Sequence, residues 1–505
     1  MLSLAAAATL GGSCALAAAP NLCSHDGRWA AASTRAPAPV LEYLYSLGDA
    51  RFDLRAACAQ WAGMFSQRHQ SAADSAQQSR RIPARLIVFP AEGVNQRELV
   101  EALKKTGYVR MIERSRNFVV VLLSSLTPTA RLVSIINSPQ VGYFEPDCDG
   151  PDYLTTSMDL PTAVSAQSHC WQRAARKTFP NDPCLDELWG HQKIGWDSAV
   201  AARSLPRIVA VLDSGIDAAH EDLARNVVLN LASPEAPYSQ GGRLNARCAT
   251  SGRCFPHGTE MAGTIGGRMD NGIGVAGVAP NSLLLPIVIS RVESGLLARI
   301  STIAAGIDAA VEDGAEIINI SAKWPVDSRA ISESIVAAVG GQSAVRRLVI
   351  TGYATSLDRD DTVREYFPSQ YRCLAGVIAA VPTDMRGQEL FNPKGHPDAK
   401  DGRIHAPGVD IVVTTTENSE RGYALSGAAG ASSAAAYVSG VVALVWGSPP
   451  LNKCDAQQIK QLLFCRSKSS NSTRYPWVNV DFLRELANVD PAVDCPGALA
   501  ALGCN

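Results

Sequence analysis

An excess of charge of either sign is missing from this chain. Its 505 residues include 46 Lys and Arg against 48 Asp and Glu, which gives a net charge of −2 at pH 7. Proteins that bind nucleic acid or anionic membranes through their surface field carry a basic excess, so we expect neither partner here. Hydrophobic residues make up 46% of the chain and charged residues 19%, a balance that suits a large globular protein of several domains.

Long hydrophobic runs are also scarce near the start of the chain, where the one example is residues 1–19. This run is too short and too rich in Ala and Gly to span a membrane, and its final residues, Ala17-Ala18-Ala19, suit signal peptidase. We therefore predict a cleaved signal peptide, no membrane span and a secreted or periplasmic location, although the run lacks a basic start. A lipobox ending at Cys14 is the alternative, and Gly11-Gly12-Ser13 fits it poorly.

The cysteines lack any C-x-x-C spacing, which argues against a zinc site. Of the 13 cysteines, Cys14 lies in the predicted signal, and 13 less one leaves an even number. Many of them crowd two regions, at Cys148, Cys170, Cys184, Cys454, Cys465, Cys495 and Cys504. This crowding predicts disulfides formed in an oxidising compartment. The pairing is not readable from the sequence, beyond a local bridge that Cys248 and Cys254 could form across a short loop.

The stretch on which the rest of the chain depends is residues 207–217, RIVAVLDSGID. Its apolar run from Ile208 to Leu212 predicts a parallel strand buried on both faces, and Asp213 follows directly. Open α/β sheets carry their chemistry at the carboxyl ends of such strands, which makes Asp213 a candidate functional residue.

Two later stretches supply partners for Asp213. His257 opens HGTEMAGTIGG, whose small residues suit a helix packed close to a sheet, and Ser432 lies at the Gly-led start of a long apolar helix. An Asp, a His and a Ser are the parts of a catalytic triad, in which the His takes the Ser proton and the Asp orients the His. The GxSxG motif and the Ser-before-His order of α/β-hydrolase esterases are both absent from the sequence, which argues against that class.

These motifs resemble those of the subtilisin family of serine proteases, the subtilases. DSGID at 213–217 resembles the family's Asp motif and HGTEMAG at 257–263 its His motif. GASSAAAYVSG at 430–440 resembles the Ser motif, with Ala431 in place of Thr and Ala436 in place of Pro. Supporting segments match as well, so that the likeness covers roughly residues 188–446.

The resemblance implies a serine endopeptidase that hydrolyses protein or peptide substrates and requires no cofactor. Ser432 would be the nucleophile, His257 the general base and acid, and Asp213 its orienting partner. Ser321 and Ala322 would form the edge along which the substrate backbone lies. We further expect the protein to act as a monomer.

Elements alternate between strand and helix from residue 188 onward, with predicted strands at 316–320, 348–351 and 376–381 and a helix at 303–312. Such alternation predicts an α/β fold, a doubly wound parallel sheet with helices on both faces, and the resemblance implies a subtilisin-like one.

A small α+β unit precedes this sheet in a β-α-β-β-α-β-like order, with strands at 86–89, 118–123 and 141–144. Asn95 and Glu98 form a helix-capping pair in its first helix. Its position before a subtilase-like domain makes it resemble the family's inhibitory propeptide, which lies in the active-site cleft until it is cut. An ordinary accessory domain is the alternative.

The predicted division of the chain has six parts. They are a signal peptide (1–19), a helical region with linker (20–83), the propeptide-like domain (84–147), a Cys-containing linker that holds the maturation cut (148–187), the catalytic domain (188–447) and a Cys-rich extension (448–505). The chain's own propeptide is therefore a predicted partner, alongside the protein substrate.

Two further features depart from the family pattern. The family's oxyanion Asn is missing, and Thr355 lies nearest its position, with Ala354 as the alternative. Losing such a donor costs roughly 10²–10³ in turnover, so a catalytically weak or inactive binding protein is the alternative function. Lys323, followed by Trp324, stands where the family has Gly, which leaves side-chain specificity open.

Calcium is the remaining open question. Asp222 and Asn271 match positions at which family members often bind that ion, and oxygen ligands from a turn suit it. A surface Asp and a turn formed by Asn271-Gly272 are an equally good interpretation. The sequence thus predicts no metal at the catalytic site and leaves a structural calcium ion undecided.

Overall fold

The computed structural model describes residues 57–58, 85–123, 128–148, 170–228, 256–289, 298–324, 326–340, 345–357, 363–390, 402–415, 422–426, 430–467 and 476–504. The predicted signal peptide, nearly all of the 20–83 region and the suggested Cys248–Cys254 bridge lie outside these residues. Within the described ranges, no helix combines the length and the hydropathy needed to cross a membrane.

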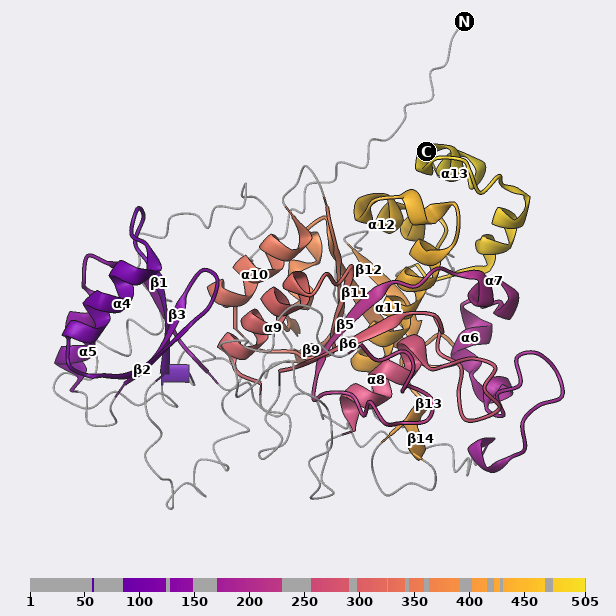
Figure 1. The fold of residues 1–505 in the computed structure, drawn as a ribbon, viewed down its shortest axis with the longest axis horizontal. Helices are drawn as coiled ribbons and strands as arrows, with labels where there is room; N and C mark the ends of the chain where they lie inside the picture. Colours follow the sequence, from indigo (N-terminus) through magenta and orange to yellow (C-terminus); the bar gives the residue numbers. More distant parts are fainter. Residues whose placement is uncertain are drawn as a thin grey trace, which may run out of the picture.

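A parallel sheet of six described strands forms the centre of the molecule (Figure 1). In spatial order the strands are β12 (Arg403–Pro407), β11 (Val377–Thr383), β8 (Leu348–Gly352), β7 (Ile317–Ile320), β5 (Ile208–Asp213) and β6 (Leu283–Val288). Every neighbouring pair among them runs parallel. The predicted doubly wound α/β sheet is confirmed, and the strand that ends in Asp213 lies inside it, between β7 and β6.

Helices cover both faces of this sheet. They are α8 (His257–Gly266) and α11 (Ala431–Gly447) on one face, and α9 (Ile300–Glu312) and α10 (Arg329–Val339) on the other. Val211 of β5 packs into the core beneath α8 and α11, whereas its neighbour Leu212 packs into the core beneath α9 and α10. Successive strand residues therefore face two different cores, which is why the sequence of β5 is apolar without alternation.

Small residues allow α8 and α11 to approach their neighbours closely. A Cβ added at Gly263 of α8 would lie 2.2 Å from the Thr414 hydroxyl oxygen, and one at Gly440 of α11 would lie 2.7 Å from Val278 Cβ. Neither glycine can be replaced without moving a packed neighbour, so the small-residue motifs specify how deeply these two helices sit.

The segments on either side of the sheet domain pack against it. Cys170 and Cys184 form a disulfide, and both are fully buried in a cluster with Val275 and Tyr423. Residues 170–187, which fall within the predicted linker of residues 148–187, therefore pack against the sheet domain. The C-terminal extension shares the core beneath α11 and is closed by the disulfides Cys454–Cys495 and Cys465–Cys504.

The remaining elements of the sheet domain are short. Its helices are α6 (Trp189–Lys193), α7 (Ser198–Arg203), α12 (Ala456–Cys465) and α13 (Cys495–Ala501), with 3₁₀ turns η2 (Cys170–Gln172), η3 (Leu185–Glu187), η4 (Ser369–Cys373), η6 (Leu451–Lys453) and η7 (Asp481–Asn488). Two antiparallel pairs complete it, β9 (Thr355–Leu357) with β10 (Val363–Glu365), and β13 (Ile411–Thr414) with β14 (Tyr423–Ser426).

The N-terminal domain is a four-stranded antiparallel sheet with strand order β2-β3-β1-β4 and two helices. Its elements are β1 (Arg85–Pro90), α4 (Gln96–Lys105), β2 (Val109–Arg114), β3 (Val119–Leu123), α5 (Thr129–Ile136) and β4 (Val141–Pro146). The predicted small α+β domain is confirmed, including the capping pair, in which Asn95 Oδ1 accepts the Glu98 backbone N–H at 3.0 Å. β2 carries charged residues on both of its faces, so the hydrophobic pattern of the sequence does not predict this strand.

This N-terminal sheet packs on the outer side of α9 and α10 (Figure 1). Phe89 of β1 and Phe118 beside β3 join the core that these helices share with the central sheet. The guanidinium of Arg329 lies over the rings of Phe89 and Tyr143, 4.7 and 5.1 Å from their centroids. A guanidinium of one domain thus packs over two aromatic rings of the other.

Candidate active site

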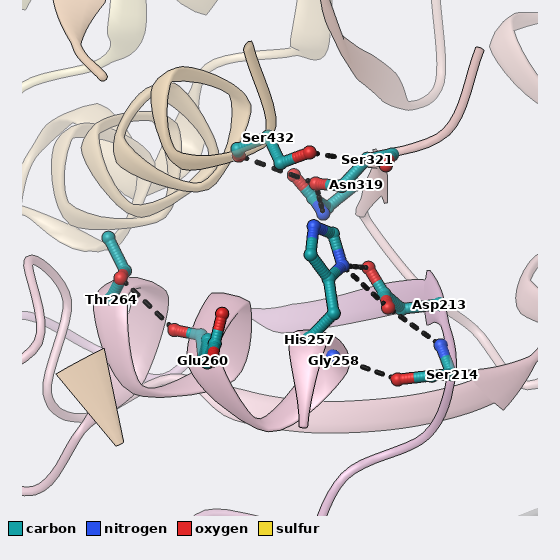
Figure 2. A network of polar contacts seen from close by, with 9 residues as sticks. All are labelled: Asp213, Ser214, His257, Gly258, Glu260, Thr264, Asn319, Ser321 and Ser432. Atoms are coloured by element: carbon teal, nitrogen blue, oxygen red, sulfur yellow. Dashed lines mark hydrogen bonds and ion pairs between the residues drawn. The ribbon is translucent and has the colours of Figure 1, made fainter. Parts of the chain in front are cut away.

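Asp213 and His257 meet at the carboxyl edge of the central sheet. The Nδ1 atom of His257 lies 2.9 Å from both carboxylate oxygens of Asp213. Asp213 is fully buried and His257 is only 5% exposed, so the pair is shielded from water. Figure 2 shows the imidazole ring between the Asp213 carboxylate on one side and Ser432, Ser321 and Asn319 on the other.

A second layer of hydrogen bonds fixes Asp213 and the start of α8. The Ser214 backbone N–H donates to Asp213 Oδ1 at 2.7 Å, and the Ser214 hydroxyl accepts the Gly258 N–H at 3.0 Å. A Cβ at Gly258 would lie 2.1 Å from the Gly215 carbonyl oxygen. The Gly after His257 is therefore required for β5 and α8 to approach closely enough for the Asp–His contact.

The buried carboxylate controls the protonation of His257. Burial lowers the pKa of the imidazole, but the charge of Asp213 and its hydrogen bond outweigh that effect and raise the pKa above its usual value of 6.5. Because Nδ1 faces the carboxylate, the proton of the neutral ring belongs on Nδ1, and Nε2 is left as the basic atom. The arrangement therefore suits a general base that becomes a stabilised cation.

Ser432 lies in the first turn of α11, where the chain enters the helix through Gly430 with a φ of 42°. Its side chain is partly exposed, and the hydroxyl donates to the Ser321 carbonyl oxygen at 3.4 Å. The Ser321 hydroxyl lies at the same distance from the Ser432 carbonyl oxygen, 3.4 Å. The end of β7 and the start of α11 are thus joined at the residue with the expected nucleophilic hydroxyl.

Asn319 and Ser439 hold this junction in place and were not assigned a role from the sequence. The Asn319 side-chain amide donates to the Ser321 hydroxyl at 2.9 Å, and the Ser439 hydroxyl donates to Asn319 Oδ1 at 3.0 Å. Asn319 is the polar residue within the apolar run INIS of β7, and it is fully buried. A buried amide in a central strand requires partners, which is the signal that could have identified it.

The structure also places the predicted edge residue Ala322 and the positions considered for the missing oxyanion Asn. Ala322 is buried beside Ser321, and Trp324 pairs with Phe367 through backbone hydrogen bonds of 2.8 and 2.9 Å. Ala354 is buried after β8, and Thr355 begins β9, but the Thr355 side chain lies outside what the structure describes. Which group takes the place of the oxyanion Asn therefore stays a prediction.

Asp222 and Asn271, the residues matching a calcium site, instead bond to each other. The Asn271 amide nitrogen donates to Asp222 Oδ1 at 2.6 Å, and Oδ2 accepts the Val275 N–H at 2.9 Å and the Tyr423 hydroxyl at 3.1 Å. Asp222 is thus occupied by protein donors, and Asn271 presents its nitrogen rather than its oxygen. Among the described residues no cluster of three His, Cys, Asp or Glu could hold a metal ion, and this pair does not fit one as it stands.

Comparison with known proteins identifies the family. The model of the family described as the subtilase family matches residues 207–475, more than half of the chain. The chain belongs to this family of serine proteases. The resemblance read from the Asp, His and Ser motifs is therefore confirmed.

Several curated relatives share between a quarter and a third of their aligned residues with this chain. The thermophilic serine proteinase of Bacillus sp. (strain AK1) is 27% identical over 368 residues, which cover 72% of this chain and 78% of the relative. Fervidolysin of Fervidobacterium pennivorans is 32% identical over 301 residues, covering 55% of this chain and 40% of its own length. The major intracellular serine protease of Bacillus subtilis is 31% identical over 251 residues, which are 50% of this chain and 70% of that protein.

The fold also matches solved structures. The crystal structure of fervidolysin, described as a keratinolytic enzyme related to subtilisin, superposes with a TM-score of 0.56 at 22% identity, covering 80% of this chain and 61% of that one. The leader-peptide processing serine protease of Staphylococcus aureus gives 0.53 at 17% identity, covering 80% and 99%. These likenesses concern the fold alone.

Proposed function

We propose that this protein is a secreted serine endopeptidase that hydrolyses peptide bonds through Asp213, His257 and Ser432. The observation that carries the proposal is the buried pair in which His257 Nδ1 lies 2.9 Å from both Asp213 oxygens. Ser432 lies on the opposite side of the same ring, at the start of a long helix (Figure 2).

The chemistry follows from these positions. His257 Nε2 accepts the Ser432 hydroxyl proton while Oγ bonds to the carbonyl carbon of the substrate. When the tetrahedral intermediate collapses, the C–N bond breaks and His257 gives the same proton to the leaving amine. Water then attacks the acyl-enzyme, loses a proton to His257, and the carboxylic acid leaves as the proton returns to Ser432 Oγ.

The start of α11 supplies part of the stabilisation of the oxyanion. The Ser432 backbone N–H lies in the first turn of a 17-residue helix, where the helix dipole favours negative charge. The family's Asn donor has no equivalent in the sequence of residues 348–357. Loss of such a donor costs roughly 10²–10³ in turnover, so we expect a slow protease rather than a fast one.

The N-terminal domain is proposed to act as the enzyme's own inhibitory propeptide. Glu145 and Asp147, at the end of its last strand, accept hydrogen bonds from the first turns of α10 and α9. The maturation cut is proposed within residues 149–169, which separate this domain from the buried Cys170–Cys184 disulfide. Disulfides in both parts, Cys58–Cys148 and Cys170–Cys184, support a secreted or periplasmic location.

The test is the intact mass of the expressed wild type beside Ser432→Ala. The wild type should lose its N-terminal part while the variant stays joined, because only the former has the nucleophile. If only the wild type is cut, Ser432 works as proposed. If both stay at full length, self-processing is absent and the proposal of a self-processed zymogen is wrong.

A second candidate function is a catalytically weak or inactive binding protein with the subtilase fold. The missing oxyanion Asn and the replacement of Thr by Ala431 favour it. Such a protein would keep its N-terminal domain attached and would not react with a phosphonofluoridate probe for active serines, whereas a working Ser432 would be labelled. If another protease cuts both the wild type and Ser432→Ala, the labelling still distinguishes an active protease from an inactive binding protein.

A further inference from the structure

One buried chain of hydrogen bonds connects two residues of α11 through the end of β7. The Ser439 hydroxyl, in the third turn of α11, donates to Asn319 Oδ1 at 3.0 Å. The Asn319 amide nitrogen donates to the Ser321 hydroxyl oxygen at 2.9 Å, and that hydroxyl donates to the Ser432 carbonyl oxygen at 3.4 Å. The chain therefore leaves the helix at one residue and returns to it at the expected nucleophile; Figure 2 shows its last three members.

The Asn319 side chain fixes the direction of every bond in this chain. An amide nitrogen can only donate and an amide oxygen can only accept, so the Ser321 oxygen must accept and the Ser439 hydroxyl must donate. Ser321 has one hydroxyl proton, which is then left for the Ser432 carbonyl. The three supporting side chains are buried, and those of Asn319 and Ser439 are fully shielded from water. Loss of one member therefore leaves its neighbour without a partner in the protein interior.

The spacing of the four residues shows what the chain fixes. Asn319 in β7 and Ser321 just after it are two residues apart, so they share one face of the sheet. Ser432 and Ser439 are seven residues apart, so they share one face of α11. Two contacts on one strand face are thus matched to two contacts that lie two turns apart on one helix face. Such a pair resists both sliding of the helix along its axis and rotation about it.

The strand that makes these contacts is the neighbour of the strand that carries Asp213. Asn319 of β7 is in register with Val211 of β5, two residues before Asp213. Asp213 in turn holds His257, whose Nδ1 lies 2.9 Å from both carboxylate oxygens. The chain therefore relates Ser432 to the same two strands that position the base. Reaction rates depend steeply on such placement, since a displacement of about 1 Å can cost on the order of 10²-fold.

We infer that Asn319 is a positioning residue for the proposed hydrolysis, which holds Ser432 in register with His257. It acts through the Ser321 hydroxyl, and Ser439 keeps its amide oriented. The inference rests on the proposed function, because it concerns the same reaction, and it gives Asn319 no proton transfer of its own. All four groups in the chain are uncharged, so its loss should slow the covalent step without changing the pKa of His257.

The experiment measures how fast a phosphonofluoridate probe labels Ser432 in the protein as recovered after expression. In this reaction Oγ bonds to phosphorus, and fluoride and the hydroxyl proton leave. The rate constant at saturating probe, kinact, reports the covalent step, and the probe concentration that gives half of that rate, KI, reports binding. Both are measured from pH 5 to pH 9, because a change in the base would move the midpoint of the profile and a change in the position of Oγ would not.

The variants are Asn319→Ala, Ser439→Ala and the two combined. Ser439→Ala removes one oxygen atom and leaves the strand intact, so it decides the question if Asn319→Ala does not fold. Ser448→Ala is the matched control, because its hydroxyl is also buried on α11 but bonds within the helix, to the Leu444 carbonyl oxygen at 2.7 Å. It should therefore report the effect of removing a buried hydroxyl from this helix and nothing more.

Asn319→Ala should lower kinact by at least about tenfold, and Ser439→Ala severalfold, with KI and the pH midpoint unchanged. The combined variant should be no slower than Asn319→Ala, because Ser439 acts only through that amide. Ser448→Ala should match the wild type. A wild-type kinact in Ser439→Ala, additive losses in the combined variant, a moved midpoint, or an equal loss in Ser448→Ala would each overturn the inference and leave the protease function standing.

Hydrogen exchange keeps the two questions separate if the wild type is not labelled. That result contradicts the protease function, and the placement of the Ser432 backbone is then tested without chemistry. A peptide of residues 430–438, whose sequence is the same in every protein compared, should exchange with deuterium severalfold faster in Ser439→Ala than in the wild type or in Ser448→Ala. Equal exchange in the wild type and Ser439→Ala overturns the inference about Asn319, whatever the activity.

Discussion

Glu145 of the N-terminal domain and Ser328 of the catalytic domain are joined by a hydrogen bond of 2.7 Å at the start of helix α10. The same carboxylate accepts the backbone N–H groups of Arg329 at 3.0 Å and Ala330 at 3.2 Å. Two residues further, Asp147 accepts the N–H of Ser301 at 3.0 Å in the first turn of α9. One strand thus offers two carboxylates to two helix N-termini, where the helix dipoles favour negative charge.

The first prediction concerns Glu145→Gln. The amide nitrogen of Gln presents donors where the carboxyl oxygens of Glu145 accept the α10 N–H groups, so the loss of docking free energy should match that of a helix cap, about 1 kcal/mol or more. In a Ser432→Ala background, which keeps the chain joined, the α10 first-turn amides should exchange with deuterium severalfold faster. Glu101→Gln, on an exposed face of the same domain, should change nothing. Unaltered exchange in Glu145→Gln would contradict a docking role for this carboxylate.

The second prediction is that docking weakens as the pH rises. Burial raises the pKa of Glu145 to about 7 from its usual value near 4.5, opposed by its hydrogen bonds and assisted by the nearby charge of Asp327. The docked state therefore binds the extra proton, so its stability is full at low pH and is lost as the pH rises through 7. If the N-terminal domain is released as proposed, its inhibition constant for the rest of the protein should increase between pH 5 and pH 8. Glu145→Gln should flatten that dependence.

The third prediction concerns the pH profile of catalysis. His257 must be neutral to accept the Ser432 proton, and Asp213 raises its pKa above 6.5. The value of kcat/KM should therefore rise with pH through a pKa above that value. Asp213→Asn should move the midpoint to lower pH and reduce kcat by on the order of 10⁴-fold. A profile that stays in place in Asp213→Asn would show that another group controls the titration.

The fourth prediction tests the missing oxyanion donor. If the position of Thr355 is the one that faces the oxyanion, Thr355→Asn should raise kcat by up to about 10²-fold with little change in KM. Ala354→Asn is the matched control on the adjacent residue. A gain in Ala354→Asn alone would assign the position to residue 354 instead.

The fifth prediction is that chelation leaves the protein's stability unchanged. The Asp222 carboxylate already accepts hydrogen bonds from Asn271, Val275 and Tyr423. The carboxylate therefore does not depend on calcium for partners, and EDTA should leave its contacts unchanged. Asp222→Ala should lower Tm by about 4 °C or more, because buried donors lose their acceptor. Calorimetry with and without EDTA measures both effects, and a fall in Tm on chelation of the wild type would contradict the expectation.

Much of this architecture could be predicted because it is encoded in short, local patterns. The unbroken apolar run before Asp213 gave a buried parallel strand, and the glycines around His257 and Ser432 gave helices packed close to it. The strand β2 was not located, because its charged residues Arg110, Glu113 and Arg114 hide the period-two pattern. Its position depends on pairing with β3, which is a contact between distant residues.

In the candidate site, too, local motifs could be predicted and contacts between distant residues could not. Motifs located Asp213, His257 and Ser432, whereas the buried support from Asn319 and Ser439 depends on two elements meeting across 120 residues of sequence. The disulfide partners Cys58 and Cys148 are likewise separated by 90 residues. Neither relation has a local signature, because both exist only after the sheets and helices have packed.

The disulfides described above also divide the chain at one place. Cys58–Cys148 closes the N-terminal part, while Cys170–Cys184, Cys454–Cys495 and Cys465–Cys504 close the catalytic part, so none of these four bridges crosses residues 149–169. A single cut there would change an intramolecular contact at high effective concentration into a bimolecular equilibrium. As far as these four described bridges are concerned, dilution of the cut protein would separate the two parts, and the protein's own concentration would set how much of the pair stays together.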